Sequence, residues 1–142
     1  MTYQNENGCS PLMIAITQKN EHVAIKLIDD KCDLNLQDKN GMTALMYAVV
    51  HNVHALIKKL VDSNCDLNIK NNYGDIAINY AYINNYAMNI IINKYIENKD
   101  VSFLENHEDK TSIMTFLCKN NLVDKIWKLY NDTITKTILM YI

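Results

Sequence analysis

Arginine is absent from this chain and glycine is rare. Of its 142 residues only three are Gly and none is Arg, so all 14 basic side chains are Lys. The three glycines stand far apart, which excludes the glycine-rich loop that cradles a phosphate group. Charges of one sign form no long run and the net charge is −2, which argues against nucleic acid or an anionic membrane as the main partner.

Long apolar stretches are also missing. No segment approaches the roughly 20 apolar residues that a membrane-spanning helix needs. The opening residues 1–7, MTYQNEN, are polar and lack the basic and apolar regions of an export signal. We therefore expect no membrane partner and a cytoplasmic protein, in the host cytoplasm if the source is a virus or a bacterium that secretes effectors.

The few glycines are regularly placed. Gly8, Gly41 and Gly74 recur with a period of 33. The text around them repeats, since GCSPLMIA at 8–15 matches GMTALMYA at 41–48, and CDLN at 32–35 recurs at 65–68. Glycine marks backbone that needs a positive φ, so equal spacing of glycines within repeated text predicts one structural unit used several times.

These segments resemble the ankyrin repeat family. Residues 10–13 and 43–46 fill the family's Thr-Pro-Leu-His helix start, and residues 31–35 and 64–68 fill its closing Gly-Ala-Asp-Val-Asn stretch. The resemblance implies an all-α ankyrin repeat solenoid of about four helix-turn-helix repeats with projecting turn tips. It implies a single domain over 1–142, with repeats at about 5–37, 38–70, 71–105 and 106–132, and a possible half-repeat or cap at 133–142.

Local signals place the helices within these repeats. Ser10 and Thr43 are plausible N-caps, Pro11 suits a first helical position, and Ile76 lacks the capping oxygen in the third repeat. We expect the third and fourth repeats to unfold more readily than the first two. Apolar spacing predicts helices at about 11–19, 21–30, 77–84, 86–96, 112–119 and 122–130, with a longer or bulged second helix in repeat three. The predicted core includes Val23, Ala24, Leu27, Ile28, Leu45, Ala48, Val49, Leu56, Ile57, Leu60, Val61, Ile78, Ala81, Ile90, Ile91 and Ile92.

Two cysteines indicate the redox compartment, and the residue usage indicates the kind of genome. Cys32 and Cys65 occupy equivalent slots in successive repeats, about one helix-packing distance apart, which is too far for a disulfide. Reduced thiols suit a cytosolic compartment. The heavy use of Asn, Lys, Ile and Tyr suggests an A/T-rich genome, such as that of a giant virus, a protist or an intracellular bacterium.

No residue cluster predicts catalysis, a metal or a cofactor. His51 and His54 lie three residues apart without a third ligand nearby in sequence, so a polar loop is the favoured interpretation over a zinc site. Cys9, Cys118 and His107 belong to different ends of an array in which each repeat contacts only its neighbours. We therefore predict that the chain is not an enzyme.

The resemblance implies a protein-binding module instead. Partners of the family are read by residues that flank the tip glycine and by the exposed end of the first helix. Carried over to this chain, the predicted partner-binding residues are Lys39, Met42, Val50, His51, Asn72, Tyr73, Asp75 and Ile83. Met42, Tyr73 and His51 would form the centre of the patch. The alternative is that Tyr73 packs over the neighbouring tip and Met42 covers the first helix.

The C-terminal end leaves further alternatives open. Trp127 and Tyr130 share a helix face, with core packing favoured over a partner or dimer contact. The apolar tail at 135–142 either folds back as a cap, meets another chain or precedes more repeats. The chain is then a monomer or a weak homodimer through this end. The alternative functions are a substrate-recruiting adaptor that is part of a longer chain, and a self-associating structural protein.

Overall fold

The computed structural model describes residues 3–104 and 110–140, with side chains described throughout except at 83, 110–112 and 134–138. Every regular element in these ranges is a helix. The chain divides into two compact units, residues 1–91 and 92–142, and the division falls within one helix, α5 (Asn85–Glu97).

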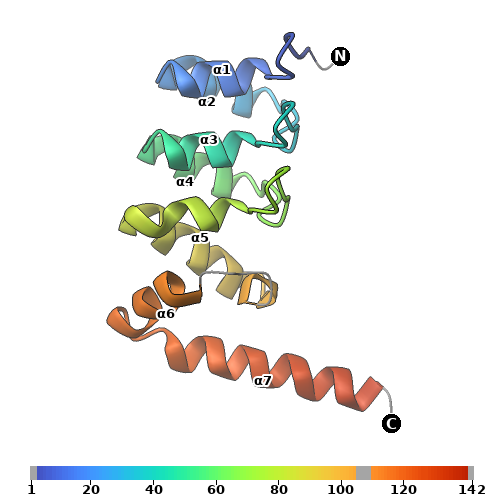
Figure 1. Cartoon of the computed structure of the whole chain (residues 1–142), viewed down its shortest axis with the longest axis vertical. Helices are drawn as coiled ribbons and strands as arrows, with labels where there is room; N and C mark the ends of the chain where they lie inside the picture. The colour runs from blue at the N-terminus through green and yellow to red at the C-terminus, as the bar shows by residue number, and fades with distance from the viewer. Residues whose placement is uncertain (1–2, 105–109, 141–142) are drawn as a thin grey trace. The chain divides into compact units, whose positions relative to one another are not determined.

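The N-terminal unit stacks helix pairs in two layers (Figure 1). The first layer holds α1 (Pro11–Thr17), α3 (Ala44–Val50) and the 3-10 helix η1 (Ala77–Ile83), and the second holds α2 (Glu21–Asp29) and α4 (His54–Asp62). Within a pair, α1 packs on α2 and α3 on α4; between pairs, α3 contacts both α1 and η1, and α2 contacts α4. The turn tips project from one side of this stack in Figure 1.

Capping explains where the first two helices begin. The Ser10 hydroxyl accepts a hydrogen bond from the Met13 amide at 3.2 Å, and the Thr43 hydroxyl accepts from Met46 at 3.4 Å. Each bond satisfies one of the amides that a helix start leaves without an intrahelical partner. The predicted caps are therefore confirmed, as is Pro11 at the first helical position.

The third repeat departs from this pattern. Ile76 offers no side-chain acceptor, and its own amide donates to Asn79 Oδ1 at 2.8 Å. Asn84 Oδ1 accepts from the Ala87 amide, which caps α5. Helix α4 starts 33 residues after α2, and the same interval would start α5 at Ala87. Helix α5 begins two residues earlier, at Asn85. The chain crosses the shortened span as a 3-10 helix, which rises more per residue than an α-helix. The prediction of a longer second helix is confirmed, since α5 has 13 residues and α4 has nine.

The core of the N-terminal unit follows the predicted pattern with three differences. Leu56, Ile57 and Leu60 are fully buried. Val23, however, is 43% exposed, because Ala24 and Ile28 already fill the inward face of α2. Leu27 and Ile90 are half-buried where full burial was expected.

The C-terminal unit has its own small core. It contains the end of α5, the short 3-10 helix η2 (Ser102–Leu104), α6 (Lys110–Lys119) and α7 (Val123–Met140). The rings of Tyr95 and Phe103 lie 4.6 Å apart between centroids, and both side chains are fully buried. Helices α6 and α7 pack on each other, and their inward side chains are Ile113, Phe116, Leu117 and Ile126.

The C-terminal tail corrects one expectation. Residues 133–140 continue α7, which runs for 18 residues, so they neither fold back as a cap nor start a separate half-repeat. The physical reason is visible in the sequence, since residues 131–140, NDTITKTILM, contain no Gly or Pro that would end the helix. The predicted irregular tip around residues 105–109 lies outside the described residues.

Candidate functional site

The three turn tips share one hydrogen-bonded framework. At the base of each tip stands an Asn or Asp, at positions 5, 38 and 71, which recur with the same period as the glycines. Asp38 Oδ1 accepts from the amides of Asn40 and Met42, both at 2.9 Å. The same two bonds recur at Asn5, to residues 7 and 9, and at Asn71, to residues 73 and 75. A side chain thus closes each turn by bonding its own backbone.

The glycines complete these turns as predicted. Gly8, Gly41 and Gly74 all have a positive φ, between 75° and 83°, and each amide donates to the carbonyl of the Asn or Asp at the base. A Cβ on Gly41 would lie 2.8 Å from backbone atoms of Asn71 and Asn72. Glycine is therefore required there both for the conformation and for the approach of the next tip.

Successive tips are bonded to one another. The Lys39 amide donates to the Asn7 carbonyl at 3.0 Å, and the Asn72 amide donates to the Asn40 carbonyl at 2.9 Å. The Gln37 side chain donates to both Gly41 and Lys70 carbonyls at 2.9 Å. These bonds make the three tips one ordered surface, which sets their side chains at fixed positions.

Two tyrosines fasten the first helices to the tips. Tyr47 on α3 donates its hydroxyl proton to Asp38 Oδ2. At the equivalent position of η1, Tyr80 accepts from Asn71 Nδ2 at 2.6 Å. Burial, followed by the hydrogen bond to Asp38, raises the pKa of Tyr47 well above its ordinary value. Burial also raises the pKa of Tyr80, against a lowering effect of Asn71. Both phenols are therefore neutral, structural groups.

The predicted partner-binding residues lie on this surface with different exposure. Tyr73 is 75% exposed at the third tip and Val50 is 52% exposed at the end of α3. The alternative that Tyr73 packs over the neighbouring tip is therefore wrong. Met42 is half-buried, and its sulfur accepts from Asn71 Nδ2 at 3.4 Å.

The remaining predicted residues are held in place to different degrees. His51 is half-buried and stacks on Tyr47, with 6.2 Å between ring centroids. Lys39 is exposed. Asn72 is also exposed, and its Nδ2 donates to the Lys39 carbonyl at 2.8 Å. Asp75 is half-buried and accepts from the Tyr80 hydroxyl at 3.4 Å. The side chain of Ile83 lies outside the described residues.

Sequence reasoning missed one exposed aromatic on this layer. Tyr82 on η1 is 61% exposed, whereas the equivalent Ile16 and Val49 are buried on α1 and α3. The 3-10 helix turns each residue further round its axis than an α-helix does. By the sixth residue of the helix, a position that points inward in α1 therefore points to solvent.

The described His and Cys side chains that sequence singled out for chemistry have structural surroundings, and His107 lies outside the described residues. His54 stacks on Tyr86 at 4.5 Å and its Nε2 lies 2.8 Å from Asn52 Oδ1. Among the described residues no group of three or more His, Cys, Asp or Glu side chains could hold a metal ion. All four cysteines are free thiols. Burial, followed by Asp33, raises the pKa of Cys32, which disfavours the reactive thiolate.

The C-terminal unit contains one exposed aromatic where core packing was expected. Trp127 is 62% exposed and stacks on Tyr130, with 6.1 Å between ring centroids. Ile126 takes the inward position of this turn, and the next residue on an α-helix is rotated by about 100°. The favoured interpretation of Trp127 as a core residue is therefore wrong.

Comparisons with known proteins identify the family. The family model described as ankyrin repeats, three copies, matches residues 1–71, which is half of the chain. A solved structure described as EF0377, an ankyrin repeat protein, is similar with a TM-score of 0.60 and 22% sequence identity; the match covers 89% of this chain and 61% of that one. No curated protein matches the chain. The chain belongs to the ankyrin repeat family, and its fold is an ankyrin repeat solenoid.

Membership of the family defines the class of protein and the general kind of activity. Ankyrin repeats are generally protein–protein interaction modules, and the fold is typically a non-enzymatic scaffold.

The chain spans 61% of the length of the solved structure it matches. No helix in the described part of the chain is both long enough and apolar enough to cross a membrane.

Proposed function

We propose that this chain is a non-enzymatic module that binds one protein partner on the tips and first helices of its first three repeats. The observation that supports this most is the pairing of a rigid framework with exposed apolar side chains. Tyr73 and Val50 need no exposure for folding, yet they stand on tips and a helix that are fixed by hydrogen bonds. Pre-ordered anchors of this kind bind with a small entropic cost.

The partner-binding residues of this proposal are those predicted from the sequence, with Tyr73 and Val50 as the main anchors. Met42 and His51 act differently, because each is half-buried and supports the surface as well as lining it. Binding of this type is stoichiometric, and it leaves the partner chemically unchanged. We further propose that it takes place in the cytoplasm, where the four free thiols stay reduced.

Affinity capture from cytosolic extract tests the proposal with matched variants. The Val50→Lys/Tyr73→Ala variant changes the proposed face, whereas the control variant Val23→Lys changes a Val of similar exposure on α2, in the second layer. We expect one protein to be retained by the native chain and by the control variant and to be lost by the first variant. Retention by all three chains would move the site away from this face.

Self-association through the C-terminal unit is the second candidate function. It is favoured by the exposed Trp127 and by Leu139 and Met140, which are 65% and 85% exposed near the end of α7. Sedimentation velocity over a range of concentrations tests it, with Trp127→Gln as the variant. A mass that rises with concentration in the native chain but not in the variant would support this candidate over the first. The alternative function, a recruiting adaptor that is part of a longer chain, is tested by the sequence of the complete gene.

A further inference from the structure

Charged residues of the N-terminal unit are segregated between its two helical layers. The first helices α1, α3 and η1 read PLMIAIT, ALMYAVV and AINYAYI, and none contains a charged residue. The second helices α2 and α4 contain six, namely Glu21, Lys26, Asp29, Lys58, Lys59 and Asp62. The two faces therefore differ in kind, although the net charge of the whole chain is only −2.

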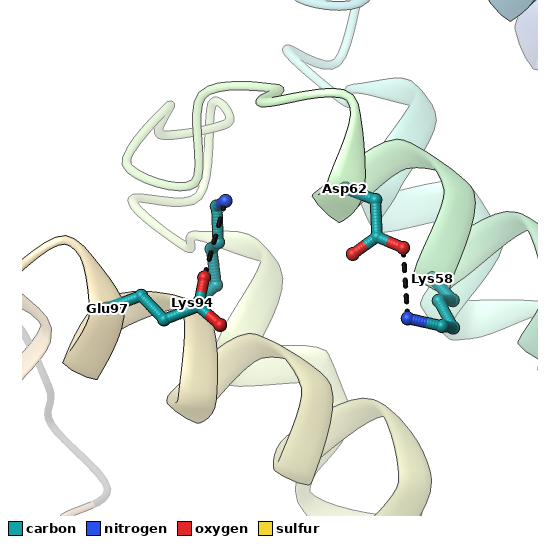
Figure 2. A network of polar contacts seen from close by, with 4 residues as sticks. All are labelled: Lys58, Asp62, Lys94 and Glu97. Atoms are coloured by element: carbon teal, nitrogen blue, oxygen red, sulfur yellow. Dashed lines mark hydrogen bonds and ion pairs between the residues drawn. The ribbon is translucent and has the colours of Figure 1, made fainter.

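The charges of the second layer are largely paired with each other. Lys59 Nζ lies 2.6 Å from Asp29, an ion pair that joins α4 to α2. Along α4, Lys58 bonds Asp62 at 2.9 Å, and in α5 of the C-terminal unit Lys94 lies 3.6 Å from Glu97; Figure 2 shows these two pairs. Exposed pairs such as Lys58–Asp62, whose side chains are 57% and 58% exposed, contribute little stability and form an ordinary water-facing surface.

The first layer exposes apolar and aromatic surface instead. Val50 and Tyr82 are exposed, and Ile14, Tyr47 and Tyr80 are half-buried. The hydroxyls of both half-buried tyrosines are already used within the fold. What remains for a partner on these helices is therefore mainly aliphatic and aromatic carbon.

The carboxylates next to this layer already have partners within the fold. Asp38 is 9% exposed and bonds two backbone amides and the Tyr47 hydroxyl. Asp75 is half-buried and accepts from the Tyr80 hydroxyl at 3.4 Å. Both are thus engaged by their own repeat, and neither stands on the first helices as a counter-charge for a cationic partner.

We infer that this face binds a partner segment that has aliphatic and aromatic side chains and carries no charge where it contacts the first helices. The inference rests on the proposed function and names the class of partner for the same site. A charged side chain placed against α1, α3 and η1 would lose its hydration without gaining an opposite charge. At the tips, Glu6, Lys39 and Lys70 are exposed and of mixed sign, so the inference is limited to the segment that contacts the first helices.

Selection from a displayed random peptide library on the immobilised native protein tests this inference. We expect enriched peptides that are rich in aromatic and aliphatic residues and poor in charged ones. Their Kd should change less than about twofold between about 0.1 M and about 1 M salt, where the Debye length falls from about 10 to about 3 Å. Val50→Lys should weaken them about tenfold or more, whereas Val23→Lys, its counterpart on the charged layer, should leave the Kd unchanged.

The outcomes separate the two proposals. Enriched peptides that carry a charged motif, and that weaken more than about tenfold at the higher salt, would overturn the uncharged partner but leave the protein-binding function standing, provided that Val50→Lys still weakens them. Peptides that bind both Val variants as tightly as the native protein would overturn both proposals, because the face would not be the site. Failure to enrich any peptide would also count against both.

Discussion

Repeats two and three use the same positions for the same tasks, yet with different physical results. Each has a tip base, a glycine three residues on and a tyrosine nine residues on. In repeat two the base is Asp38, the helix is capped by Thr43 and α3 is an α-helix. In repeat three the base is Asn71, the cap position is the buried Ile76 and the helix is η1. In an array, therefore, what a residue contributes to stability depends on the neighbouring repeat as much as on its own repeat.

The glycines provide the sharpest test of this comparison. Ala at Gly41 would have to adopt a positive φ, at about 1–2 kcal/mol, and would crowd the backbone of the next tip, at about 1–3 kcal/mol. At Gly74 no described atom lies within 4 Å of an added Cβ, so from the described residues Ala there meets only the first cost. In urea unfolding, Gly41→Ala should therefore lose more unfolding free energy than Gly74→Ala, and the difference should equal the cost of crowding the next tip.

Gly8→Ala serves as the intermediate case in this series. Its Cβ would lie 3.0 Å from the Lys39 amide nitrogen, slightly farther than the contacts at Gly41. We expect its loss of stability to fall between those of the other two variants. Equal losses in all three would mean that the φ penalty alone acts and that the tips are not closely packed on each other.

The tyrosines that fasten the tips predict the next largest difference. Tyr47→Phe removes a donor from the buried carboxylate of Asp38, and hydrogen bonds to charged groups are worth about 1.5–3 kcal/mol. Tyr80→Phe removes a bond to the neutral Asn71 amide, which is worth about 0.5–1.5 kcal/mol, and a bond to Asp75 that is weak because it is 3.4 Å long. Unfolding free energies of the two variants measure the difference. A larger loss for Tyr80→Phe would contradict the assignment of charge as the cause.

Helix capping predicts a smaller difference between the two repeats. The Thr43 hydroxyl accepts from an amide at the start of α3, whereas Ile76 has no side-chain oxygen to accept from the equivalent amide of η1. A missing cap costs about 1 kcal/mol of helix stability. Amides of η1 should therefore exchange with solvent about fivefold faster than those of α3. Hydrogen exchange followed by NMR would measure both in one sample. Slower exchange in η1 would contradict the expectation that the third repeat opens more readily than the second.

Sequence alone predicted the first two repeats and the tip glycines because each of these depends on local chemistry. Ser10 and Thr43 act within three residues of their own position, and the positive φ of Gly41 is also a local requirement. The second role of Gly41, which is to admit the next tip, was not readable from its own repeat. The periodic recurrence of an Asn or Asp at positions 5, 38 and 71 was also present in the sequence. It would have revealed the tip framework had it been read together with the glycines.

The features that sequence did not predict depend on where a neighbouring element begins. Because α5 begins early, the first helix of the third repeat is the 3-10 helix η1, and the tighter winding of η1 brings Tyr82 to the surface. Trp127 is exposed because Ile126 already occupies the inward position of α7. Periodic spacing identifies both faces of a helix but does not decide which of two adjacent apolar residues points inward.

Stability at high pH gives the smallest expected effect and tests the Asp38–Tyr47 pair separately. The native pKa of Tyr47 is raised above that of an unfolded tyrosine, which is about 10. Below this pH both states keep the proton and the contribution to stability is complete. Above it the unfolded chain loses the proton first, so the unfolding free energy decreases as pH rises. Urea midpoints should therefore fall above about pH 10 less steeply in Tyr47→Phe than in the native chain. If Tyr47→Phe kept the native slope, the half-buried Tyr47 would not be the group responsible.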